Sequence, residues 1–171
     1  LVKRKANVKI VETKGIEKHP VPVLGIDYKV EIVYKNIKIT ELNIENKTIK
    51  IALPNRYKKM NNQEILDLAI DKMYEQIAKV EMERVMEKTR IMVGFAPEEY
   101  EIKKIKTLGK CENGKITIHP ELVKYNRQVI EYVVLHQYCH LKHKNHTKAF
   151  FKMIETYLPD YKKCEEILLN I

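Results

Sequence analysis

The first third of the chain alternates apolar with polar side chains, a period of two that is typical of half-buried antiparallel strands. Turn signals at Gly15, Gly25 and Asn36 separate the alternating segments. We therefore expect a small antiparallel sheet in this part of the chain. Its predicted strands are Val8–Val11, Tyr28–Tyr34, Ile37–Ile39 and Thr48–Leu53.

The spacing of apolar residues changes to three and four after Asn61, which indicates a helix. Asn61–Asn62 supplies a cap and Gln63–Glu64 a polar first turn, while Gly94 ends the pattern. A helix of about thirty residues is long for a globular domain. An unbroken helix and one with a break near Glu81–Met82 both agree with the pattern.

Strand and helix patterns follow each other in the rest of the chain. Asn113–Gly114 is a strong hairpin signal, and its predicted strands are Ile102–Cys111 and Ile116–His119. The apolar run Val129–Leu135, interrupted by one glutamate, predicts a buried helix from about Arg127 to Lys144.

A further helix is expected to begin at Asn145 or Thr147, and a final amphipathic turn reaches Leu169. The whole pattern predicts an α+β fold with an N-terminal antiparallel β-sheet, a long helix, a hairpin and a buried helix. We divide it into a β-rich region of residues 1–60 and a helical region of residues 61–171. Together they are expected to form one compact unit.

Four of the six histidines fall within eleven residues near the C-terminus. His136 and His140 are four residues apart, so on a helix both imidazoles leave the same face within reach of one ion. A turn at Lys144–Asn145 would bring His146 back as a third ligand. His143 is the histidine that we expect not to bind.

A His-x-x-x-His pair alone is more often a surface pair than a metal site. The third histidine and the apolar run before the pair favour a metal, because buried imidazoles without partners are costly. Three neutral imidazoles with one open position are typical of catalytic zinc. The sequence therefore predicts a zinc site on His136, His140 and His146.

Gln137 occupies the position at which the zinc-peptidase signature H-E-x-x-H has its general base. A glutamine amide can hold a water by hydrogen bonds, but it cannot accept a proton as a carboxylate does. A laboratory substitution and a natural loss of the base both agree with this residue. We do not expect another carboxylate to replace the base; those considered are Glu131, Glu121, Glu155 and Asp160.

The composition is that of a soluble globular protein, with 44% hydrophobic and 32% charged residues. No apolar stretch is long enough for a membrane span, and no secretion signal is visible. Three cysteines, an odd number without framework spacing, indicate a reducing compartment, so we expect the cytoplasm. Cys139 is expected in the core; Cys111 is either a buried thiol, which we favour, or an inhibitory zinc ligand.

Basic residues outnumber acidic ones by 32 to 23, which gives a net charge of +9. They are spread along the chain with small clusters, of which Arg56–Lys59 is one. A solvated lysine-rich surface is the favoured interpretation, and an acidic partner such as nucleic acid is the alternative.

The C-terminal half resembles the YgjP-like metallopeptidase family, a branch of the zincins related to the SprT-like and minigluzincin groups. The resemblance covers about residues 90 to 165. Its matching segments are Leu108–Cys111, Gly114–His119, Ile130–Thr147, Ala149–Phe151 and Leu158–Tyr161. Besides Gln137, the chain departs from the family pattern at Leu108, Lys110, His119 and Phe151.

The resemblance implies a zincin-like core, a zinc ion on the three histidines, and a peptide or unfolded protein as substrate. A strand just before the histidine-bearing helix would suit an extended substrate. We expect that substrate to pair with Thr117, Ile118 and His119. The first hypothesis is therefore a zinc metallopeptidase impaired by Gln137. The alternative is a noncatalytic zinc-containing module that binds a protein or nucleic acid.

Overall fold

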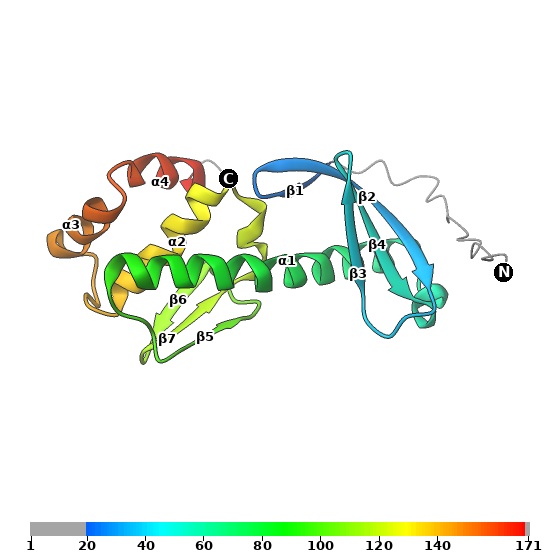
Figure 1. Cartoon of the computed structure of the whole chain (residues 1–171), viewed down its shortest axis with the longest axis horizontal. Helices are drawn as coiled ribbons and strands as arrows, with labels where there is room; N and C mark the ends of the chain where they lie inside the picture. The colour runs from blue at the N-terminus through cyan, green and yellow to red at the C-terminus, as the bar shows by residue number, and fades with distance from the viewer. Residues whose placement is uncertain (1–19, 170–171) are drawn as a thin grey trace, which may run out of the picture. The chain divides into compact units, whose positions relative to one another are not determined.

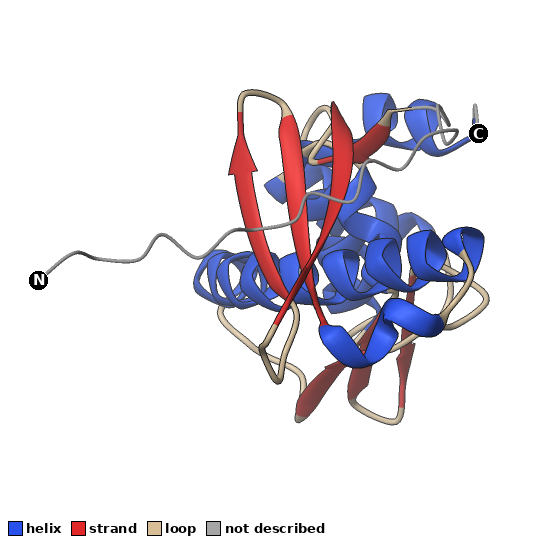
Figure 2. Ribbon diagram, turned by 90° about the vertical axis from the view of Figure 1, so that its right-hand side faces the viewer, coloured by secondary structure: helices blue, strands red, loops and turns tan. Residues whose placement is uncertain are grey.

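The computed structural model describes residues 20–169 and divides into two compact units. The first contains residues 20–22 and Ile26–Met73, and the second contains Val23–Gly25 and residues 74–169. The predicted strand Val8–Val11 lies outside the described residues. The α+β class is confirmed, and the elements of both units can be followed in Figure 1 and Figure 2.

The first unit is built on a four-stranded sheet with the order β1-β2-β4-β3. The strands are β1 (Val21–Val23), β2 (Ile26–Lys35), β3 (Glu41–Glu45) and β4 (Thr48–Pro54). β4 runs parallel to β2 and antiparallel to β3. The prediction of a wholly antiparallel sheet was therefore wrong, and the segment Ile37–Ile39 precedes β3 instead of forming a strand.

Burial explains this strand order. β4 carries the fully buried Ile49, Ile51 and Leu53, whereas most of β3 is exposed. Because a central strand is covered more completely than an edge strand, β4 takes the place between β2 and β3. The turn at Asn46–Lys47, where both residues have positive φ, returns the chain from β3 into β4. A short 3₁₀ helix, η1 (Asn55–Lys59), follows β4.

The long helix α1 (Asn62–Val93) runs without a break through Glu81–Met82. Its start is capped as predicted, since Glu64 N–H donates to Asn61 Oδ1 at 2.9 Å. Its end is also confirmed, because Gly94 adopts φ +84° and donates to the Arg90 carbonyl at 2.9 Å. Its first turns, up to Met73, belong to the first unit and the rest belongs to the second.

The second unit contains a three-stranded sheet with the order β5-β7-β6. The strands are β5 (Glu99–Ile102), β6 (Gly109–Glu112) and β7 (Lys115–Ile118). The predicted hairpin is confirmed: β6 and β7 are antiparallel and joined by Asn113–Gly114, both at positive φ. β5 runs parallel to β7. The predicted strand Ile102–Cys111 is thus split between β5 and β6.

Four helical elements complete the second unit: η2 (Pro120–Lys124), α2 (Arg127–His140), α3 (Lys148–Tyr157) and α4 (Tyr161–Leu169). The buried helix α2 ends at His140, four residues before the predicted end. It is central to the core: β6 and β7 lie against it, and α3 and α4 also pack on it. Tyr138 fixes α2 to α1 by donating its hydroxyl proton to the Met86 carbonyl at 2.9 Å.

Candidate metal centre

The histidines are brought together by the end of α2 and the start of α3. His136 and His140 lie one turn apart on α2, which begins at the cap Asn126, whose Oδ1 accepts from Val129 N–H at 3.0 Å. The chain then turns back, with His143 N–H donating to the Cys139 carbonyl at 2.8 Å. His146 follows just before Thr147, the cap of α3.

The three Nε2 atoms converge on one point. They lie 3.2 Å apart for His136 and His140, 3.0 Å for His140 and His146, and 3.1 Å for His146 and His136. Nitrogens this close together could bind one ion at the usual zinc–nitrogen distance of about 2.0–2.1 Å. His136, His140 and His146 would hold such an ion through their Nε2 atoms.

The proton on His140 is placed by a backbone partner. Its Nδ1 lies 3.0 Å from the carbonyl oxygen of His143, which can only accept. Nδ1 therefore carries the proton, and the lone pair of Nε2 points to the site. His143 contributes its carbonyl oxygen, and its imidazole is not part of the histidine cluster.

Phe150 forms a common surface beneath the three imidazoles. Its ring centroid is 4.9 Å from those of His136 and His146 and 4.6 Å from that of His140. The side chain is completely buried on α3. Sequence reasoning treated it only as the inner face of a helix, because its spacing does not show which rings it meets.

Burial of His136, reinforced by the neighbouring His140 and His146, lowers its pKa to about 4. At neutral pH the imidazole is therefore neutral, the form that binds a metal. Burial, with a hydrogen bond to Glu165, also raises the pKa of Tyr132, whose hydroxyl lies 3.4 Å from His136 Nδ1. That hydroxyl keeps its proton over the physiological range.

A family model described as a YgjP-like metallopeptidase domain matches residues 1–170. The chain belongs to the YgjP-like metallopeptidase family. No curated protein matches it. Among solved structures, the metallopeptidase zymogen abylysin of Pyrococcus abyssi is similar over 52% of this chain and 92% of its own length, with 21% identity and a TM-score of 0.48.

In this YgjP-like chain the side chain of Gln137, a residue of α2, lies against Gly109, the first residue of β6. The side chain is buried, and a Cβ added to Gly109 would lie only 3.0 Å from its Nε2 and 3.1 Å from its Cγ. Glycine at position 109 therefore makes room for the side chain that follows the first metal-site histidine. Any larger residue there would push Gln137 aside.

The structure does not support strand pairing of a substrate with Thr117 and Ile118. β7 is the central strand and already pairs with β5 and β6 on its two sides, so its backbone has no free edge. The side chain of His119 instead caps η2, since its Nδ1 accepts from Glu121 N–H at 3.0 Å. The edge strand nearest Gln137 is β6.

The other acidic and sulfur groups considered from the sequence lie outside the histidine cluster. Among the described residues, the cluster of side chains that could hold a metal ion contains His136, His140 and His146 alone. Glu131 pairs with Lys88 at 2.8 Å and with Arg84 at 3.4 Å. Cys139 is buried. The remaining groups are half-buried or exposed; they are Cys111, Glu121, Glu155 and Asp160.

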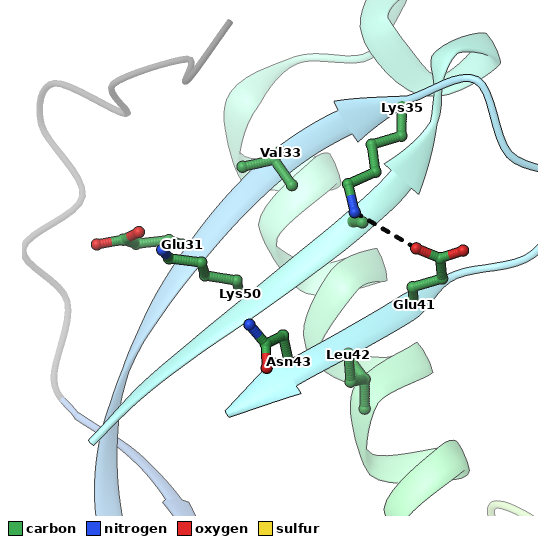
Figure 3. A pocket seen from close by; sticks show the side chains of 8 residues that line it. Glu31, Val33, Lys35, Glu41, Leu42, Asn43 and Lys50 are labelled. Atoms are coloured by element: carbon green, nitrogen blue, oxygen red, sulfur yellow. Dashed lines mark hydrogen bonds and ion pairs between the residues drawn. The ribbon is translucent and has the colours of Figure 1, made fainter. Parts of the chain in front are cut away.

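A separate pocket lies on one face of the N-terminal sheet (Figure 3). Glu31, Val33 and Lys35 from β2 line it together with residues of β3 and β4, and a Lys35–Glu41 ion pair at 3.4 Å crosses its rim. It contains no histidine or cysteine. Among the helices that the structure describes, none is both long enough and apolar enough to cross a membrane.

Proposed function

We propose that this chain is a zinc-dependent metallopeptidase-like hydrolase whose activity is strongly impaired by Gln137. The convergence of three Nε2 atoms within 3.2 Å of one another carries the proposal. His136, His140 and His146 would hold the metal. Bound zinc lowers the pKa of a coordinated water to about 7 and polarises a carbonyl.

Gln137 limits the reaction because of its amide. It can hold a water by hydrogen bonds, yet it cannot take the proton that a glutamate would accept. General base catalysis contributes roughly 10²- to 10⁴-fold to a rate. The chain is therefore expected to bind zinc and peptide and to hydrolyse the peptide slowly.

We propose that an extended peptide or unfolded protein binds along the edge of β6. His119 N–H donates to the Leu108 carbonyl at 2.9 Å, so the alternate residues Gly109 and Cys111 direct their backbone groups to the unpaired edge. The Thr107 hydroxyl donates to the Gly109 carbonyl at 3.0 Å. An incoming strand would share that carbonyl or displace the hydroxyl.

The decisive experiment compares zinc-loaded Gln137→Glu with the unaltered chain on an unfolded protein substrate. We expect cleavage by the glutamate variant to be about 10²- to 10⁴-fold faster. Adding His146→Ala to the glutamate variant should abolish that gain, which excludes a contaminating protease. Equal, negligible rates in both chains with zinc confirmed bound would contradict the hydrolase proposal.

A noncatalytic zinc-containing binding module is the second candidate, and glutamine in place of the general base favours it. In that case the unaltered chain would retain peptides without cleaving them, and Gln137→Glu would not create activity. The net charge of +9 is the support for a nucleic-acid form of this module. Binding at low salt that falls steeply as salt rises would be its signature.

A further inference from the structure

We infer that Glu165, acting through the hydroxyl of Tyr132, holds His136 in the tautomer that binds a metal. The inference rests on the proposed metal site and names two positioning residues for it. Glu165 lies on α4 and Tyr132 lies on α2, one turn before His136. The sequence pattern did not connect α4 with the histidines.

The direction of the hydrogen bonds follows from their chemistry. The Tyr132 hydroxyl donates to Glu165 Oε1 at 2.9 Å, because an ionised carboxylate only accepts. Its single proton is then committed, so the same oxygen can only accept from His136 Nδ1, 3.4 Å away. Nδ1 must carry the imidazole proton, and the lone pair of Nε2 is left to face His140 and His146.

Contacts between α4 and α2 hold Glu165 close to Tyr132. Tyr161, one turn before Glu165, stacks on the Tyr132 ring with centroids 6.3 Å apart and planes 20° from parallel. The adjacent Cys164 is buried with its Sγ 3.7 Å from the Gln128 carbonyl of α2. Two anchors therefore fix the register at which Glu165 reaches Tyr132.

The three metal-site histidines differ in what orients them. His140 is fixed by the His143 carbonyl of its own loop, and no hydrogen bond to His146 Nδ1 is found within the described residues. His136 alone depends on side chains, one of which comes from a different helix. Loss of the Tyr132 hydroxyl or of the Glu165 carboxylate should therefore change the orientation and tautomer of His136.

Zinc affinity of the full-length chain, measured by competition with a chromogenic chelator, tests the inference. Tyr132→Phe and Glu165→Leu should each weaken zinc binding about 10- to 100-fold. This is the usual loss of metal affinity when a residue that hydrogen-bonds to a metal ligand is replaced. Because both act through one hydroxyl, the double variant should be no weaker than Tyr132→Phe. Glu165→Gln, which keeps an acceptor oxygen, should restore most of the affinity. Glu166→Leu, an exposed neighbour on α4, is the matched control.

Nitrogen NMR of the imidazoles in the metal-free chain provides a second, independent readout. His136 should be protonated on Nδ1 in the parent and in Glu165→Gln, and should shift toward Nε2–H in Tyr132→Phe. An unchanged tautomer in folded Tyr132→Phe, or additive losses in the double variant, would overturn the inference. A parent that binds no zinc would refute the proposed function, while the tautomer measurement would still decide this inference.

Discussion

The chemistry of the site depends on which atom each histidine presents. His136, His140 and His146 direct Nε2 to a common point, whereas His143, in the same short segment, supplies its carbonyl oxygen to His140 Nδ1. A backbone carbonyl is present whatever the side chain. The four clustered histidines therefore divide into three whose imidazoles converge and one that supports His140 through its main chain.

His143→Ala should leave zinc affinity nearly unchanged, because the carbonyl that orients His140 remains. His146→Ala removes a proposed ligand. Zinc affinity should therefore fall by more than the roughly 10- to 100-fold that is typical when a hydrogen-bond partner of a ligand is replaced. Isothermal titration of the two metal-free variants with zinc measures both effects. Equal losses in the two variants would show that His143 binds the metal.

At the scale of elements, the site depends on the junction between α2 and α3. α2 carries His136 and His140, and α3 begins two residues after His146. Thr147 fixes this beginning, since its Oγ1 accepts from Phe150 N–H at 3.3 Å. The same cap thus determines where Phe150 lies beneath the imidazoles and where His146 meets the other two.

Thr147→Ala should cost about 1 kcal/mol in the free energy of unfolding, as loss of a helix cap usually does. Zinc affinity should fall as well, because the position of His146 becomes less restricted. Chemical denaturation of the metal-free protein and zinc titration measure the two effects. Thr147→Ser keeps the hydroxyl and is the control; a loss as large as that of alanine would argue against the cap.

At the scale of the whole molecule, a buried carboxylate joins the long helix α1 to α2. Glu81 on α1 pairs with Arg84 at 2.6 Å and with Arg127, the first residue of α2, at 3.1 Å. Burial by itself would raise the pKa of Glu81, but the hydrogen bonds and charges of the two arginines outweigh it and lower the pKa. Folding therefore favours the ionised form.

Glu81→Gln should lower the free energy of unfolding by about 1–3 kcal/mol near neutral pH, the usual cost of removing a buried hydrogen-bonding partner. Because the folded pKa lies below the usual 4.5, the stabilisation is complete above that value and is lost as pH falls through the folded pKa. Parent and variant should therefore converge in acid, which denaturation at several pH values will show.

Glu87 provides the matched control for that series. It also lies on α1 and pairs with an arginine three residues later, Arg90, at 2.7 Å, but both side chains are at least half exposed. Exposed pairs contribute little to stability because solvent screens the two charges. Glu87→Gln should therefore change the free energy of unfolding little, and an effect equal to that of Glu81→Gln would contradict the role assigned to burial.

The sequence by itself determined the features that depend on residues a few positions apart. The His136–His140 spacing, the cap Asn61 and the Asn113–Gly114 turn each act through local geometry. For α3 the pattern left Asn145 and Thr147 as alternatives, and the structure shows Thr147 as the cap. Such features can be recognised along the chain because the interacting groups are near neighbours. They predicted the long helix and the hairpin, which the structure confirms, and a metal site on the three histidines, which stays a prediction.

Only the tertiary structure decided how distant segments meet. Burial placed β4 between β2 and β3, and pairing on both sides closed β7 to a substrate strand. Packing brought Phe150 beneath the histidines and Glu165 to Tyr132. These contacts result from the packing of apolar surfaces that are distant in the sequence, and no local pattern encodes the outcome.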